Sequence, residues 1–160
     1  MATLRMSASE YRAYMAAESR KKGPKHRNHI VYVFEDGFVS NSKEDTKAHG
    51  RITDKYDSEK EYTRWGQLRL MERAGQITGL RKQVPFLLHE EFRSKDGVLH
   101  KAVYYKADFV YTEGKSGEEV VEDVKALDTT TGKYLTTETF RLKWKLLMAN
   151  YPDKVFRLYG

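Results

Sequence analysis

A stripe of apolar residues at helical spacing lies in the middle of the chain. Ser58 and Glu61 precede it and form the Ser-x-x-Glu pattern of a helix capping box, and Gly75 follows its last apolar residue. The pattern predicts a helix over about residues 58–74, with the stripe packed against the core. The apolar residues of this stripe are Tyr62, Trp65, Leu68 and Met71.

A second helix is predicted closer to the C-terminal end. Helical spacing returns from about Thr137 and stops at Pro152, whose ring cannot continue a helix. Basic residues lie off the apolar stripe of this helix and are candidate contacts to DNA phosphates. The apolar stripe holds Phe140, Trp144, Leu147 and Tyr151, and the basic residues are Arg141, Lys143 and Lys145.

Between and after these helices, β-rich runs are separated by turn signals. Asp96-Gly97 and the segment from Gly114 to Gly117 divide the first three runs, which we expect to form an antiparallel meander. The order helix, three strands, helix, strand predicts an α/β sandwich, with helices flanking both faces of a mixed central sheet. The predicted strands cover residues 84–92, 98–112, 118–127 and 154–159.

The N-terminal part of the chain is more polar and carries a dense basic run. A short helix is predicted over residues 8–20, followed by a basic arm that contains Gly and Pro. Asp36-Gly37 lies between two β-rich pieces and predicts a hairpin, and the polar stretch 41–56 is expected to be a loop. The basic residues of the arm are Lys21, Lys22, Lys25 and Arg27.

The length of 160 residues fits one domain with an appended arm. We divide the chain into an N-terminal helix and basic arm (1–29), a hairpin and loop leading into the core (30–56), and the core itself (57–160). The 29 Lys and Arg residues exceed the 23 Asp and Glu residues, which gives a net charge of +6. This charge mildly favours a polyanionic partner such as DNA.

Two absences narrow the class of protein. The sequence has no cysteine, which excludes a disulfide framework, a thiolate metal site and a Cys nucleophile. No apolar stretch approaches the roughly 18 residues of a membrane span, and the first residues lack the apolar region of a signal peptide. We therefore expect a cytoplasmic protein that is not embedded in a membrane.

Acidic residues occur in segments that are otherwise apolar. Asp123 and Lys125 lie on one face of the third predicted strand because side chains alternate with a period of two. The preceding strand carries Asp108 in an apolar run, and Glu61 shares a helical stripe with Trp65. Buried carboxylates need a partner or a metal ion. Oxygen ligands without Cys or clustered His suit Mg²⁺, or Mn²⁺ in its place, and point to metal-assisted phosphodiester chemistry.

The order of these residues and elements resembles the PD-(D/E)XK nuclease superfamily, also called the restriction-endonuclease-like fold. The resemblance covers residues 57–158 and rests on the helix with Glu61, the segment ADFVYT with Asp108, the segment VVEDVKA with Asp123 and Lys125, and the basic helix RLKWKLL. These segments look most like small phage and prophage endonucleases, which are similar to the end-cleaving nucleases of some transposons and to Holliday junction resolvases.

The resemblance implies a metal-dependent DNA endonuclease that acts in phage or mobile-element recombination or replication, with branched DNA among its candidate substrates. Asp108, Asp123 and the backbone carbonyl of Val124 would bind the metal. Glu61 would complete the acidic shell, and Lys125 would orient the attacking water or help to deprotonate it. A homodimer is a plausible assembly because two-fold symmetry suits the cutting of two strands. If a phage encodes the protein, the host cytoplasm is its location.

Several site residues have a simpler structural explanation. Glu61 occupies a position at which a glutamate often serves only as a helix cap. Asp123 and Lys125 can form a structural ion pair, and Glu122, on the opposite face, is expected to be paired or solvated. Gln83 matches a glutamine that such nucleases often carry just before their first strand, and it is a weaker candidate than the others.

Alternatives also exist at the level of function. The same basic surface could serve a catalytically silent nucleic-acid-binding module, and the same acidic residues could serve an RNase or a transposase-associated nuclease. We expect the basic arm to contact DNA phosphates, and the alternative is a solvated tail. Trp65 and Trp144 are expected to be core residues and not a platform for stacked bases.

Overall fold

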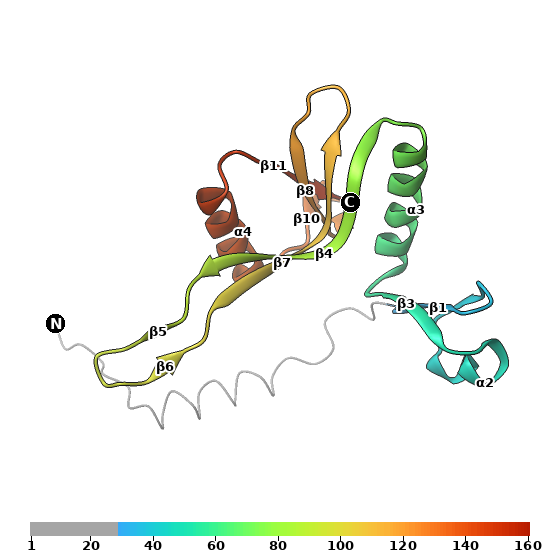
Figure 1. Cartoon of the computed structure of the whole chain (residues 1–160), viewed down its shortest axis with the longest axis horizontal. Coiled ribbons are helices and arrows are strands. Elements are labelled where there is room, and N and C mark those ends of the chain that lie inside the picture. The colour runs from blue at the N-terminus through green and yellow to red at the C-terminus, as the bar shows by residue number, and fades with distance from the viewer. Residues whose placement is uncertain (1–28) are drawn as a thin grey trace.

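A computed structural model describes residues 29–160 of the chain (Figure 1). The predicted helix 8–20 and the basic residues Lys21, Lys22, Lys25 and Arg27 lie outside this range. In chain order, the elements are β1 (Val31–Phe34), β2 (Val39–Ser40), the 3-10 helix η1 (Lys43–Asp45), α2 (Thr46–His49), β3 (Ile52–Tyr56), α3 (Glu59–Arg73), β4 (Ile77–His89), β5 (Phe92–Arg93), β6 (Leu99–His100), β7 (Val103–Glu113), β8 (Glu119–Val124), β9 (Leu127–Asp128), β10 (Lys133–Tyr134), α4 (Glu138–Asn150) and β11 (Val155–Tyr159).

The centre of the molecule is a mixed sheet of four strands in the order β11-β8-β7-β4. β4, β7 and β8 pair antiparallel, as the meander predicts, and β11 pairs parallel to β8 after the connection through α4. The principal elements follow the predicted order, namely α3, the three strands, α4 and β11. The chain is therefore a mixed α/β protein with a mixed central sheet.

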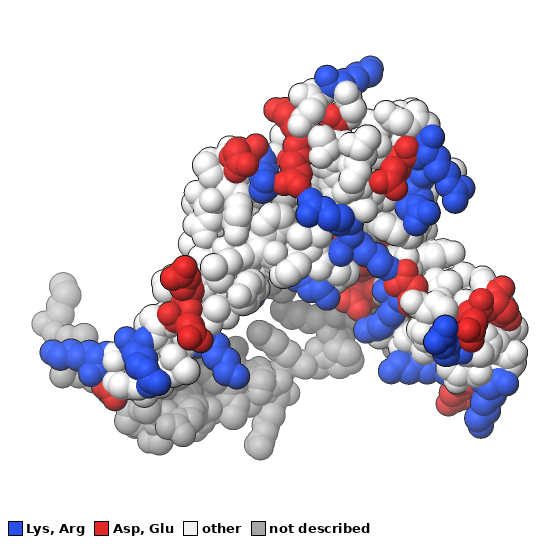
Figure 2. Space-filling model, in the orientation of Figure 1, with Lys and Arg blue, Asp and Glu red and all other residues white. Residues whose placement is uncertain are grey.

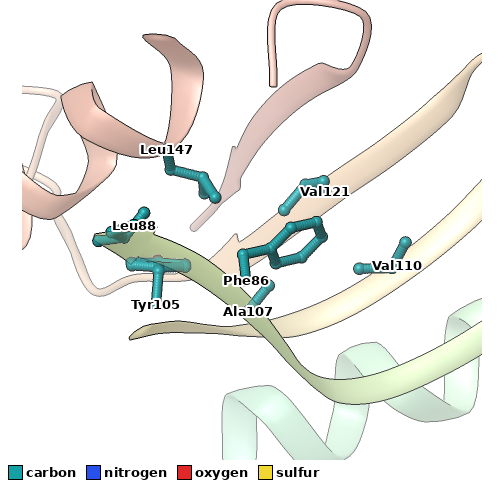
Figure 3. Close-up of a cluster of buried hydrophobic side chains, with 7 residues drawn as sticks. All are labelled: Phe86, Leu88, Tyr105, Ala107, Val110, Val121 and Leu147. Carbon is teal, nitrogen blue, oxygen red and sulfur yellow. The ribbon is translucent and has the colours of Figure 1, made fainter. Parts of the chain in front are cut away.

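The two long helices cover different apolar clusters of this sheet. Leu68 of α3 is buried together with Phe109 and Val120, and Trp65 packs against them. Leu147 of α4 is buried in the other cluster, which Figure 3 shows on the α4 side of the strands. Removing these side chains from water supplies most of the stability of such a core, at about 25 cal/mol per Å² of apolar surface. The other residues drawn in this second cluster are Phe86, Leu88, Tyr105, Ala107, Val110 and Val121.

Both helices begin at the capping residues that the sequence indicates. The Ser58 hydroxyl accepts a hydrogen bond from the Glu61 N–H (3.1 Å), and the Thr137 hydroxyl accepts one from the Phe140 N–H (3.1 Å). Such a cap satisfies one of the backbone donors that a helix leaves free in its first turn. Both predicted helices are thus confirmed to within one residue at these ends.

The expected loop over 41–56 is wrong. This stretch contains η1, α2 and β3, and β3 pairs antiparallel with β1 to form a sheet in the order β2-β1-β3. Tyr56 is buried at the end of β3, where it pairs with Val31, while Thr53 and Lys55 are exposed. Only alternate residues of β3 are buried or half-buried, so its polar composition hid the strand. The predicted hairpin at Asp36-Gly37 is confirmed, with Gly37 at a φ of +87°.

The predicted strands of the meander have different limits. β4 begins at Ile77, seven residues before the predicted start at Val84, and the run 98–112 is divided into β6 and β7. The hairpin of β5 and β6 extends beyond the body of the sheet (Figure 1). The predicted strand 118–127 ends at Val124 in the structure, and the small β9–β10 hairpin after it was not predicted. Within residues 29–160, no helix combines the length and the apolar character needed to cross a membrane.

Candidate active site

The candidate residues come from three neighbouring strands and the first turn of α3. β7 and β8 run antiparallel, and Phe109 pairs with Glu122. The adjacent residues, Asp108 on β7 and Asp123 on β8, therefore lie opposite one another. Gln83 on β4 lies between two positions that pair with Ala107 and Phe109 and therefore faces Asp108. Pairing of the strands thus brings together residues that are up to 40 positions apart in the sequence.

Asp123 is buried, with 3% of its surface exposed, and both of its carboxylate oxygens have partners. One oxygen accepts a hydrogen bond from the Tyr105 hydroxyl, and the other is ion-paired with the Lys125 ammonium. The same ammonium lies 3.3 Å from the Val124 carbonyl and 4.4 Å from the centre of the Phe140 ring. Lys125, predicted to share a strand face with Asp123, is therefore its direct partner.

Asp108 is held in place by the backbone of the neighbouring strand. One carboxylate oxygen accepts a hydrogen bond from the Val124 N–H (2.8 Å), and the other accepts one from the Gln83 amide (3.3 Å). Burial, reinforced by the negative charge of Asp123, raises the pKa of Asp108 to about 7. The two aspartates therefore repel one another in a poorly solvated place. A cation between them would reduce this repulsion.

Glu61 serves as a cap and as a member of this cluster. Its Oε2 accepts a hydrogen bond from the Asp57 N–H (3.0 Å), close to the start of α3, while its Oε1 accepts one from the Gln83 amide (2.9 Å). Only 4% of its surface is exposed, and burial is the main cause of the raised pKa of this carboxyl. The two explanations of Glu61 are thus compatible, since each uses a different oxygen.

Gln83 joins the two halves of the cluster and has an unusual backbone. Its φ of +55° lies in the left-handed region, and among residues 29–160 it is the only non-glycine residue with a positive φ. This conformation interrupts side-chain alternation, so the Lys82 ammonium reaches Trp65 of α3 (5.3 Å to the ring centre) while the Gln83 amide reaches Glu61. Such backbone strain costs about 1–3 kcal/mol and concentrates at functional sites.

The donor set of this cluster fits a hard divalent cation. Glu61, Asp108 and Asp123 are three poorly solvated carboxylates, and Lys125 is the one ammonium paired with any of them in the described structure. No three His, Asp or Glu side chains of residues 29–160 are arranged as a ready-made ligand shell. Mg²⁺ does not require one, because it is commonly held by one or two carboxylates, waters and substrate phosphate oxygens.

The neighbouring acid Glu122 has a purely structural environment. It is fully buried, and the Arg64 guanidinium binds it through two hydrogen bonds of 2.6 and 2.8 Å. The Tyr111 hydroxyl donates a further bond of 2.9 Å, and Arg157 binds the same tyrosine oxygen (3.1 Å). Of the two expectations for Glu122, paired or solvated, the structure confirms that it is paired.

The basic residues predicted on the second helix differ from one another. Arg141 and Lys145 are exposed on α4. Lys143 is partly buried and donates to the Tyr104 carbonyl (3.1 Å), so it fastens α4 to β7. A phosphate contact is therefore easier for the first two residues than for Lys143. Trp65 and Trp144 pack against the two apolar clusters as expected, but both stay partly exposed.

Sequence reasoning missed Tyr105 as a member of the site. Its hydroxyl binds Asp123 although 18 residues separate the two, and its ring packs against Trp144 of α4 (5.5 Å between ring centres). Tyr105 and Ala107 are both buried on the α4 side of β7. The alternation of β7 could have placed Tyr105 on this face, but its contact with Asp123 depends on how β7 and β8 are paired.

The comparison with known families covers most of the chain. The sequence model of a family described as "Protein of unknown function (DUF1064)" matches residues 43–158. The chain belongs to this family. The DUF1064 match begins at η1 and ends within β11, so it includes α3, the strands β4, β7 and β8, most of β11 and every candidate residue from Glu61 to Lys125. No curated protein matches the chain.

Proposed function

We propose that this DUF1064 protein is a metal-dependent endonuclease that hydrolyses phosphodiester bonds in DNA. The observation that carries the proposal is the meeting of Asp108 and Asp123 on adjacent strands, with Lys125 bound to one of them and Glu61 linked to the other through Gln83. This grouping supports the PD-(D/E)XK resemblance, whose residues it brings together. Phage or mobile-element DNA, including branched recombination intermediates, is the proposed substrate class.

Each residue has a distinct part in the proposed reaction. Asp108, Asp123 and the Val124 carbonyl would hold Mg²⁺, which when bound supplies Lewis-acid stabilisation of the phosphate and a lower pKa for a bound water. The Lys125 ammonium places a positive charge beside Asp123, where it can orient water and stabilise negative charge that develops on the phosphate. Tyr105 fixes the orientation of the Asp123 carboxylate from the opposite side.

Glu61 and Gln83 act on Asp108 from the side of α3. The Gln83 amide donates to both carboxylates, so it holds them at a fixed spacing. Glu61 also accepts a hydrogen bond from the Asp57 N–H, so the two carboxylates are held at a fixed place relative to the start of α3. We assign Gln83 a positioning role and not a catalytic one.

The proposal is tested with purified full-length protein and linear, flapped and four-way-junction DNA. Each DNA is incubated with Mg²⁺, Mn²⁺, Ca²⁺ or EDTA, and products are resolved on denaturing gels. We expect cleavage with Mg²⁺ and Mn²⁺ and none with EDTA. An RNA of the same sequence as the linear DNA distinguishes the alternative of an RNase.

Two variants distinguish this site from a contaminating nuclease. Asp123→Asn should abolish cleavage, whereas Asp153→Asn, at an exposed aspartate remote from the cluster, should leave it unchanged. Cleavage that persists in Asp123→Asn would overturn the assignment of the site. Binding of DNA without cleavage under any of the metal conditions would favour the silent binding module.

A further inference from the structure

A groove with aromatic walls lies between α3 and the N-terminal sheet. Its volume is about 800 Å³, within the range of pockets that hold small ligands. Asp54 and Tyr56 of β3 line one side, and Tyr62, Trp65 and Arg69 of α3 line the other. Tyr62 and Trp65 are partly exposed there, and Tyr62 packs edge-on against the buried Tyr56 (5.2 Å between ring centres).

Positive charge exceeds negative charge along this groove. Arg69 and Arg73 are exposed at its edge, and Figure 2 shows Lys and Arg side chains gathered over α3 at the right of the view. The Lys82 ammonium lies over the rings of Tyr56 (4.6 Å) and Trp65 (5.3 Å). Of the residues that the structure describes, Asp54 is the one acid that lines the groove, and it is ion-paired with Lys82. The guanidinium groups of the two arginines form no ion pair among residues 29–160. That of Arg69 lies 5.6 Å from the centre of the Trp65 ring, and both side chains are exposed and accessible to an anion.

The groove adjoins the candidate active site along two elements. Tyr62 follows Glu61 in α3, and Lys82 precedes Gln83 in β4. Because the side chains of Lys82 and Gln83 both reach α3, the wall of the groove continues into the carboxylate cluster. A strand lying in the groove would therefore lead toward Asp108.

We infer that this groove binds an unpaired strand of DNA next to the scissile phosphate. Partly exposed aromatic side chains offer surfaces for bases, but only an unpaired strand has bases free to leave their stack. Exposed arginines spaced four residues apart on α3 suit successive phosphates of the same strand. The inference deepens the proposed function and rests on it for the position of the cut, but the binding step can be measured without cleavage.

The test is a binding measurement with wild-type protein in EDTA. The probes are a fluorescein-labelled 15-residue oligothymidylate and a labelled 15-base-pair duplex, titrated at several salt concentrations. We expect Arg69→Ala/Arg73→Ala to weaken binding of the oligothymidylate at least about tenfold. The slope of log K against log salt should become less steep by about 1.4, since each phosphate contact on a single strand accounts for roughly 0.7. Duplex binding should change less than oligothymidylate binding.

A matched control removes the same charge elsewhere. Lys115→Ala/Lys133→Ala alters two exposed lysines outside the groove and should leave oligothymidylate binding within about twofold of wild type. An equal loss in both double variants would show a general charge effect and would overturn the inference. Unchanged oligothymidylate binding in Arg69→Ala/Arg73→Ala would overturn it as well.

Tryptophan fluorescence gives an independent readout of the groove. The chain has two tryptophans, and Trp144 packs in the α4 cluster, so a Trp144→Phe variant reports on Trp65 alone. Oligothymidylate should quench this signal, and the quenching should disappear when Arg69→Ala/Arg73→Ala is added. An unquenched Trp65 in protein that binds oligothymidylate would overturn the inference. Cleavage that is insensitive to the two arginine substitutions would refute the proposed role of the groove but not the proposed nuclease activity. Quenching by oligothymidylate without cleavage of any DNA would refute only the nuclease activity.

Discussion

Glu122 and Asp123 are neighbours on β8, both are buried acids, and each is bound by a basic side chain and a tyrosine hydroxyl. Glu122 lies on the α3 side with Arg64 and Tyr111, while Asp123 meets Tyr105 and Lys125, next to Phe140 of α4.

The two pairs differ in what surrounds them. The planar guanidinium of Arg64 matches the Glu122 carboxylate through two hydrogen bonds, and Tyr111 completes the set. Lys125 offers a single point charge to Asp123, and Asp108 adds a second carboxylate close enough for the two to repel. Burial and pairing are therefore common to both acids, and the surplus of negative charge is what distinguishes the candidate site from a structural ion pair.

The largest expected difference is in catalysis. Asp123→Asn should lower Mg²⁺-dependent cleavage at least about 1,000-fold, or roughly 4 kcal/mol, because it removes a metal ligand that stabilises the transition state. Glu122→Gln should leave the rate per folded molecule within about threefold of wild type, since this side chain lies outside the site. Initial rates on one DNA substrate, corrected for the folded fraction by circular dichroism, test the pair. Equal losses in both variants would contradict the comparison.

The Arg64–Glu122 pair should matter for stability and not for cleavage. Arg64→Met should lower the free energy of unfolding by about 3–5 kcal/mol because it leaves the Glu122 side chain buried without its main partner. Adding Glu122→Leu should recover much of this loss, since an apolar pair can replace a buried ion pair. Urea unfolding followed by fluorescence measures both. A loss below about 1 kcal/mol in Arg64→Met would contradict this prediction, because the buried pair would then contribute no more to stability than a surface ion pair does.

The geometry of the ammonium is the next difference. Lys125→Arg keeps the charge but replaces a compact ammonium by a planar fork, and we expect a 10–100-fold slower cleavage. Lys154→Arg, which alters the ion pair of Lys154 with Glu119 (2.6 Å) away from the site, is the matched control. Calorimetry with Ca²⁺ should still detect metal binding by Lys125→Arg, because the carboxylates remain. Wild-type cleavage by this variant would assign Lys125 to the fold alone.

Taken per pH unit, the smallest expected effect is on the pH dependence of stability. The pKa of Asp108 is raised to about 7 in the folded chain, so between about pH 4 and 7 the folded state holds a proton that the unfolded state has lost. The contribution of Asp108 to stability is therefore highest below about pH 4 and falls with rising pH, by at most about 1.4 kcal/mol per pH unit. The free energy of unfolding of metal-free wild type minus that of Asp108→Asn should decrease over this range. A difference independent of pH would contradict the raised pKa.

The sequence predicts the helices of this protein better than its contacts. Ser58 and Thr137 are local signals, because a cap is recognised by residues three positions away, and both helices start where these residues indicate. β3 was missed because its alternation mixes Ile52 and Tyr56 with polar residues, and its partners on β1 are 18 to 25 positions away. Strand pairing over such separations leaves little trace in a single sequence.

The same distinction holds for the candidate site. The shared face of Asp123 and Lys125 follows from the period of a strand and is borne out by their ion pair. The link of Gln83 to Glu61 and Asp108 depends on three elements, and the positive φ of Gln83 depends on the strands that pair around it. Neither feature can be derived from spacing along one strand.

The parallel pairing of β11 with β8 has a consequence for the order of folding. β7 and β8 are joined by a short turn, so their pairing closes a small loop and can form early. β11 can pair with β8 only after α4 has crossed the sheet. Only then can the Tyr159 carbonyl accept the hydrogen bond from the Lys125 N–H (2.8 Å). We therefore expect Asp108 and Asp123 to approach each other in an early hairpin, and the backbone of Lys125 to be fixed only when β11 docks in a later, slower phase. A chain interrupted between these two phases would hold the acids without an anchored lysine.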